Sequence, residues 1–263
     1  MSEIATRARR QHRFAWLLVL IGGIAAYLIV LRTLVATQNP LYVPSLLLLG
    51  SAVVPASVLV YAASGRERTP VGAGVIAAVA GIGGVFGTVA AGTLEYDTLQ
   101  RLGAVPMIMV GLIEESAKLV VPIVIVIFGR RLRSPAAGVV IGVASGMGFA
   151  TLETMGYGFA ALLESRSLAD LDQTLLLRGL LSPAGHVAWT GVTTAALWRI
   201  PIASHKGRAF LLFVGAFLGS VALHAMWDGS NSVIVRALVG LVSFVALLIV
   251  VHRSRRETAV EQG

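Results

Sequence analysis

The chain alternates between long apolar runs and short polar segments. About eight runs are close to 20 residues long, the length that an α-helix needs to cross ~30 Å of hydrocarbon at 1.5 Å per residue. We therefore predict an all-α fold, a polytopic membrane bundle of about eight transmembrane helices. The predicted spans are Phe14–Val35, Tyr42–Ala63, Val71–Gly92, Ala104–Phe128, Pro135–Leu163, Leu175–Trp198, Ala209–Trp227 and Ser232–Val251.

The composition is typical of a membrane protein. Of the 263 residues, 56% are hydrophobic and 13% are charged, and the mean hydropathy is +0.84. A soluble domain has roughly 25% charged residues. No linker or soluble domain interrupts the runs, so we predict a single integral membrane domain over residues 1–263. The first run is longer than the apolar core of a signal peptide, and we interpret it as a retained helix.

Basic residues collect in alternate connections between the runs. They lie in the N-terminal arm, in three loops and in the C-terminal tail, at residues 7–13, 65–69, 129–133, 199–208 and 253–256. The intervening connections carry acidic residues such as Asp97 and Asp170. Because a basic excess marks the cytoplasmic side, we predict that both termini are cytoplasmic. Short basic segments separated by spans form no nucleic-acid surface despite the +8 net charge, so no nucleic-acid partner is expected.

Seven ionisable side chains interrupt the predicted spans, where each costs ~2.5 kcal/mol or more. They are Glu114, Glu115 and Lys118 in the fourth span, Glu153 in the fifth, His186 in the sixth, and His224 and Asp228 in the seventh. Counting from the span ends places all of them in the outer half of the bilayer, with His186 about eleven residues into its helix. Four carboxylates, two histidines and a lysine in one layer indicate chemistry, transport or a buried ion network.

Two features of small residues are interpreted as packing. Gly83 and Gly87 are four residues apart in the third span and allow a neighbouring helix to approach closely. Ser145 stands between Gly142 and Gly146, but no glycine lies two residues before it, as a rhomboid-like serine nucleophile would have.

The chain has no cysteine, which excludes thiol nucleophiles and thiolate metal sites.

The remaining chemistry is hydrolysis with water as the nucleophile, by one of two routes. Imidazoles and carboxylates on separate helices can bind a divalent metal while another carboxylate activates water. Without a metal, a glutamate can act as general base while a histidine stabilises the oxyanion. The H-E-x-x-H signature of zinc proteases is absent, so the spacing leaves both routes open.

At these residues the chain resembles the PrsW family of intramembrane proteases. Residues 114–118 read E-E-x-x-K, residues 149–153 read F-x-x-x-E, His186 follows on the next helix, and residues 224–228 read H-x-x-W-D. The order and the helix placement match as well, so the catalytic helices are expected within about residues 104–228. Thr154 departs from the family, in which asparagine often follows the glutamate.

The resemblance implies an endopeptidase distantly related to the CAAX prenyl endopeptidases. It implies catalytic roles for Glu114, Glu115, Lys118 and His224. It also implies that four residues either hold a metal, with zinc the candidate ion, or orient water and the oxyanion: Glu153, His186, His224 and Asp228. Which glutamate is the base stays open, because the pair can titrate as a unit. The implied partners are the lipid bilayer and a membrane-anchored substrate resembling an anti-sigma factor, cut near the outer face of a bacterial plasma membrane.

Two other functions use the same residues. Buried carboxylates, histidines and a lysine also form proton relays and ion paths in transporters. Inverted repeats or discontinuous helices would favour transport, and the sequence gives no sign of either. An inactive relative that only binds partners is the third possibility. Cleavage of a peptide substrate by the purified protein separates the three.

Overall fold

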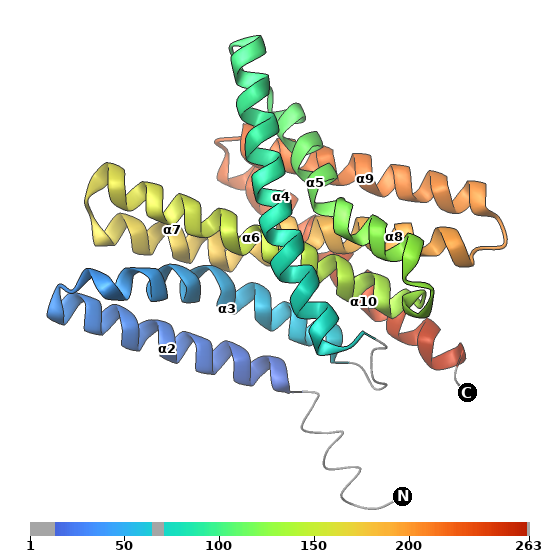
Figure 1. Ribbon diagram of the computed structural model, residues 1–263, viewed down its shortest axis with the longest axis horizontal. Coiled ribbons are helices and arrows are strands. Elements are labelled where there is room, and N and C mark those ends of the chain that lie inside the picture. Colours follow the sequence, from blue (N-terminus) through green and yellow to red (C-terminus); the bar gives the residue numbers. More distant parts are fainter. Residues whose placement is uncertain (1–13, 65–70, 262–263) are drawn as a thin grey trace, which may run out of the picture. The chain divides into compact units, whose positions relative to one another are not determined.

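The structure is a computed structural model that describes residues 14–64 and 71–261, and in these ranges it contains helices and no strand (Figure 1). The α-helices are α2 (Ala15–Thr37), α3 (Val43–Ala63), α4 (Ala73–Leu102), α5 (Met107–Phe128), α6 (Pro135–Ser165), α7 (Leu168–Leu181), α8 (His186–Ile202), α9 (Lys206–Gly229) and α10 (Val233–Glu261). Short 3₁₀ helices lie at Pro40–Tyr42, Arg130–Leu132 and Ser182–Ala184. The predicted all-α class is confirmed.

Six of the described helices are long and apolar enough to cross a membrane by length and composition. They are α2, α3 with its preceding 3₁₀ turn, α4, α6, α9 and α10. Helix α5 has 22 residues but carries the three charged side chains of the fourth predicted span. The chain is therefore a polytopic membrane protein, as predicted. The predicted basic arm at residues 7–13 and the whole predicted loop at residues 65–69 lie outside the described residues.

The prediction of one continuous helix over Leu175–Trp198 is wrong. Helix α7 ends at Leu181, a 3₁₀ turn follows, and α8 begins at His186. The reason is local, because Pro183 lacks an N–H and its ring obstructs a continuing helix. Gly185 then takes an irregular backbone conformation, with φ −123° and ψ −120°, immediately before α8.

The chain forms two compact units, and the first contains α2, α3, α7 and the part of α6 from Ala150 onward. Helices α2 and α3 pack against each other, and α3 packs against α7. The core of the unit is formed by Tyr27, Leu34, Leu46, Leu47, Leu171 and Leu175. The Tyr27 hydroxyl donates a hydrogen bond to Asp172, so the aromatic ring stays in the apolar core while its polar end is satisfied.

The second unit contains α4, α5, the part of α6 through Phe149, and α8, α9 and α10. Glycines bring α4 against α6, since a Cβ added to Gly84 would lie 2.7 Å from the carbonyl carbon of Gly148. Gly83 and Gly87 face the side chains of Ser145 and Phe149 at 3.1 and 3.0 Å by the same measure. The packing role predicted for the glycines of this helix is confirmed.

Candidate active site

The predicted glutamate pair and lysine lie together in the second unit, on one turn of α5. Lys118 Nζ is 2.8 Å from Glu115 Oε1 and 3.1 Å from Glu114 Oε2. All three residues are buried, with Lys118 only 1% exposed. The ammonium also lies over the ring of Phe149, 4.1 Å from its centroid. One cation therefore serves two buried carboxylates.

Helix α9 brings His224 to this pair. His224 Nδ1 lies 2.9 Å from Glu115 Oε1, while Nε2 faces Glu114 Oε2 at 3.6 Å and Asp228 Oδ2 at 3.0 Å. The approach of the helices depends on Gly111, where an added Cβ would lie 2.9 Å from the Val221 carbonyl oxygen and 3.4 Å from His224 Cβ. A glycine one turn before Glu115 thus sets the distance between α5 and α9.

His186 reaches the same cluster from the first residue of α8. Its Nδ1 lies 2.8 Å from Lys118 Nζ and 3.9 Å from Glu114 Oε2. The predicted position well inside a sixth helix is wrong, because the break at Ser182–Gly185 makes His186 the start of a new helix. At a helix start the backbone N–H groups of the first turn have no partner within the helix.

Ser145 supports the lysine through the backbone. A carbonyl four residues before a proline receives no helical hydrogen bond, and Lys118 stands in that place before Pro122. Ser145 Oγ, fully buried on α6, donates to the Lys118 carbonyl oxygen at 2.7 Å. The serine therefore has a structural role, as predicted, and it ties α6 to α5 directly behind the charged cluster.

Sequence reasoning missed a tryptophan and a serine that belong to this site. The indole of Trp189 stacks on the ring of His224, with centroids 4.7 Å apart and planes at 23°, and meets His186 edge-on at 5.3 Å. Its Nε1–H donates to Ser243 Oγ on α10 at 2.8 Å. A buried tryptophan and a serine in apolar runs carry no pattern that separates them from ordinary core residues, so no sequence signal could have found them.

Glu153 lies in the other unit, in the part of α6 beyond Ala150. Its Oε1 forms an ion pair with Arg178 Nη2 on α7 at 2.8 Å. The Arg178 guanidinium also lies over the ring of Tyr157, 3.7 Å from its centroid. The expected role of Glu153 as a metal ligand stays a prediction. Its described partner is a cation of its own unit.

A divalent metal fits the chemistry of the second unit's cluster. Glu114, His186 and His224 each offer one ligand atom, and these atoms all lie within 4.8 Å of one another. Two imidazoles and one carboxylate form a donor set that catalytic zinc uses. With both imidazoles neutral, as metal ligation requires, Glu114, Glu115 and Asp228 exceed Lys118 by two negative charges, which a divalent cation balances.

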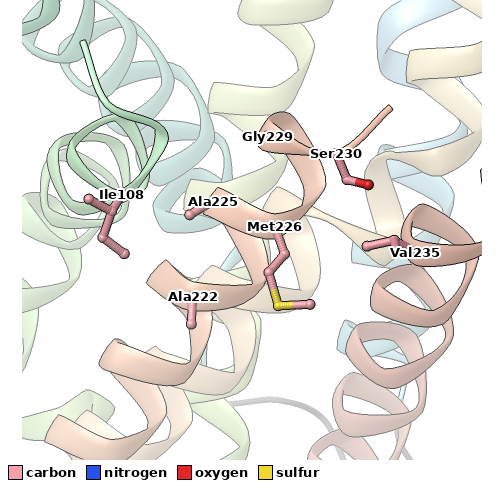
Figure 2. A pocket seen from close by; sticks show the side chains of 7 residues that line it. All are labelled: Ile108, Ala222, Ala225, Met226, Gly229, Ser230 and Val235. Atoms are coloured by element: carbon pink, nitrogen blue, oxygen red, sulfur yellow. The ribbon is translucent and has the colours of Figure 1, made fainter. Parts of the chain in front are cut away.

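A pocket of about 430 Å³ lies between the beginning of α5, the end of α9 and the beginning of α10 (Figure 2). It is lined by Ile108, Ala222, Ala225, Met226, Gly229, Ser230 and Val235. The α9 residues among these lie roughly 100° or more around the helix from His224. The pocket is apolar and borders the helix that carries the histidine, on a different face.

A family comparison decides what the cluster belongs to. Residues 69–252 match the model of the PrsW family of intramembrane metalloproteases, which is more than half of the chain. The chain belongs to the PrsW family. Comparisons with curated proteins and with solved structures gave no match.

As a PrsW protein, the chain is a membrane-embedded protease whose substrate is a protein in the membrane. The family is one of metalloproteases, and the buried cluster of Glu114, His186 and His224 suits a metal. The matched range covers all of the second unit's described helices except the last residues of α10. The transporter alternative is not favoured by this match.

Proposed function

We propose that this PrsW protein hydrolyses a peptide bond of a membrane-anchored protein, with water activated at a zinc ion held by Glu114, His186 and His224. The observation that carries the proposal is the convergence of these three ligand atoms within 4.8 Å in a buried site. The sequence suggested Glu153 and Asp228 as ligands beside the histidines. We place Glu114 in the ligand set because its Oε2 faces both imidazoles.

Glu115 has a supporting role in this proposal. Its Oε1 accepts the Nδ1 proton of His224 at 2.9 Å, which fixes the imidazole tautomer that leaves Nε2 as the ligand atom. A carboxylate behind a metal-binding histidine commonly orients the ring and increases its basicity. Glu115 is 2% exposed and held on its other side by Lys118, so little freedom remains for it to take a proton from water.

Asp228 is the proposed proton acceptor. It lies one turn after His224, its Oδ2 is 3.0 Å from Nε2, and its side chain is 33% exposed, far more than those of Glu114 and Glu115. A general base must reach both the water that it deprotonates and the solvent that later takes the proton away. Zinc, when bound, supplies a water of lowered pKa and polarises the scissile carbonyl.

The proposed substrate is a single-span protein resembling an anti-sigma factor, cut near the outer face of a bacterial plasma membrane. Acidic connections on the predicted outer side and the resemblance described above support this location. A peptide bond in the hydrocarbon core would have to abandon helical hydrogen bonds at several kcal/mol each, which favours a cut at the edge of the span.

Cleavage by the purified protein tests the proposal. A single-span substrate with flanking tags is incubated with the protein in nanodiscs, and mass spectrometry locates the cut. Glu115→Gln should reduce turnover about 10- to 100-fold and His224→Ala by about 100-fold or more. The double variant should lose little more than His224→Ala alone, because residues that act as a unit are not additive. Removal of zinc with a chelator should abolish cleavage, and zinc should restore it.

Matched controls keep the test specific. Glu164→Gln and His205→Ala make the same chemical changes at exposed positions and should cleave as the wild type does. Near-normal cleavage by folded His224→Ala, or full activity with substoichiometric metal, would contradict the proposed mechanism. A cut on the cytoplasmic side would contradict the proposed location.

A further inference from the structure

Trp189 differs from an ordinary core aromatic in what it touches. It is 2% exposed and contacts both histidines of the cluster, one through its face and one through its edge. The histidine rings also meet each other, with centroids 5.0 Å apart, and His186 contacts Phe149 at 5.4 Å. Trp189 and Phe149 therefore both pack against histidine rings of the metal-binding cluster.

The hydrogen bond and the stack restrain His224 in different ways. The bond to Glu115 fixes the direction of Nδ1, but it leaves the imidazole able to swing about the line that joins the two atoms. The nearly parallel indole at 4.7 Å removes that freedom by restricting the plane of the ring. Together the two contacts restrict where Nε2 points.

The indole is itself held from outside the family motifs. Its Nε1–H donates to Ser243 Oγ on α10, and the same hydroxyl donates to the Val239 carbonyl oxygen of its own helix at 2.7 Å. The Ser243 hydroxyl is thus used both as donor and as acceptor. Ser243 is 2% exposed, and Gly191 lets α8 approach α10 at this level, since an added Cβ would lie 3.0 Å from a methyl carbon of Leu247.

We propose that Trp189, fixed by Ser243, is a positioning residue that holds the two metal-binding histidines in the geometry required for zinc. The proposal rests on the proposed ligand set, and it extends the catalytic unit to α10, beyond the helices that carry the motifs. Trp189 acts through His224 and His186 and touches no reacting atom. Groups that orient metal ligands typically change affinity or activity by about 10- to 100-fold when they are removed.

The chain contains a matched control on the same helix. Trp198 is fully buried, and its Nε1–H also donates a short hydrogen bond, to the Leu132 carbonyl oxygen at 2.7 Å. Ring contacts link Trp189, and not Trp198, to the histidines among the described residues. Replacing each tryptophan by phenylalanine makes the same change in volume and removes one donated hydrogen bond in each case, but only Trp189 contacts the cluster.

The test measures zinc affinity of the metal-free protein, by competition with a chromophoric chelator, beside kcat and KM. Trp189→Phe and Ser243→Ala should each weaken zinc binding about tenfold and lower kcat about tenfold, with KM changed less than twofold. The double variant should match the single variants, and Ser243→Thr, which keeps the hydroxyl, should restore most of the affinity. Trp198→Phe should bind zinc as the wild type does, even where it melts at a lower temperature.

Two outcomes distinguish a failure of the positioning role of Trp189 from a failure of the proposed zinc ligand set. If the wild type binds zinc and His224→Ala does not, yet Trp189→Phe and Ser243→Ala keep wild-type affinity and kcat, the positioning role is overturned and the ligand set stands. If His224→Ala binds zinc as tightly as the wild type, the ligand set and the positioning role are both overturned. A loss of affinity in Trp198→Phe equal to that in Trp189→Phe would also overturn the positioning role, because it would reflect general loosening of the unit.

Discussion

Replacing Lys118 with methionine should destabilise the metal-free protein more than any surface substitution. Methionine has a similar length but no charge, so the change leaves Glu114 and Glu115 buried without the cation that now lies 3.1 and 2.8 Å from them. Removing one partner of a buried ion pair typically costs about 3–5 kcal/mol. For a chain of this size, each kcal/mol corresponds to roughly 2–4 °C in Tm, so we expect a fall of about 6–20 °C.

Zinc should reverse much of this loss. The ammonium is bound by Glu114 Oε2 and His186 Nδ1, residues that also belong to the proposed zinc ligand set, so the tethered cation and the metal compete for the same cluster. In the variant the carboxylates carry three uncompensated negative charges, against a net two in the wild type. Zinc at 100 times its Kd adds about 2.7 kcal/mol, and the variant's lower Kd should make its gain larger at equal zinc.

Thermal unfolding in detergent, followed with and without zinc, measures both effects. Lys206→Met is the matched control, because Lys206 is exposed at the start of α9. It should change Tm by less than about 4 °C in either condition, since an exposed charge contributes about 1 kcal/mol or less. A metal-free Lys118→Met protein that melts with the wild type would refute the buried ion network. Equal zinc-induced shifts in the two proteins would refute competition between the ammonium and the metal.

Three further predictions concern packing and topology. Gly148→Ala should lower Tm by several degrees, because its Cβ would lie 1.9 Å from a carbonyl oxygen of α4 and overpacking costs about 1–3 kcal/mol; Gly156→Ala, with open space around it, should not. Ser145→Ala should cost about 1–3 kcal/mol in unfolding experiments, since it removes the hydrogen bond that Ser145 donates to the Lys118 carbonyl oxygen. The chain has no cysteine, so single cysteines introduced at Asp97 and Arg131 can be labelled separately; Asp97 should react from outside and Arg131 from inside, and the reverse pattern would contradict the predicted topology.

The lengths of the apolar runs predicted the long helices of the fold and little beyond them. Apolar runs of membrane length located the long helices, because in hydrocarbon a helix satisfies all of its own backbone groups. The same rule produced the error at Leu175–Trp198, where a run of suitable composition conceals a break. The residues Ser182–Gly185, with a proline and a glycine, were a local signal for that break, and counting hydrophobic residues over a long window hid it.

The sequence predicted those site residues whose side chains have a high free-energy cost in a membrane. Ionised side chains such as Glu114 and Lys118 have few reasons to occur in an apolar span, so their presence alone indicated a cluster. A tryptophan or a serine carries no such free-energy penalty in an apolar span, so neither stands out in the sequence. Only the coordinates show that Trp189 stacks on His224 and that Ser243 accepts a hydrogen bond from Trp189. Which glutamate binds a metal and which orients a histidine also depends on distances between helices, which no spacing along one helix contains.

The interruption before His186 also determines how the protein has to be solvated. The first-turn amides of α8 have no partners within that helix, and in dry hydrocarbon each unsatisfied amide would cost several kcal/mol. The predicted sixth span can keep such a break only if water or protein groups reach it. Water at this break is then needed for folding as well as for catalysis. A lipid environment that excludes water from the break should therefore lower both the stability of the protein and its proteolytic activity.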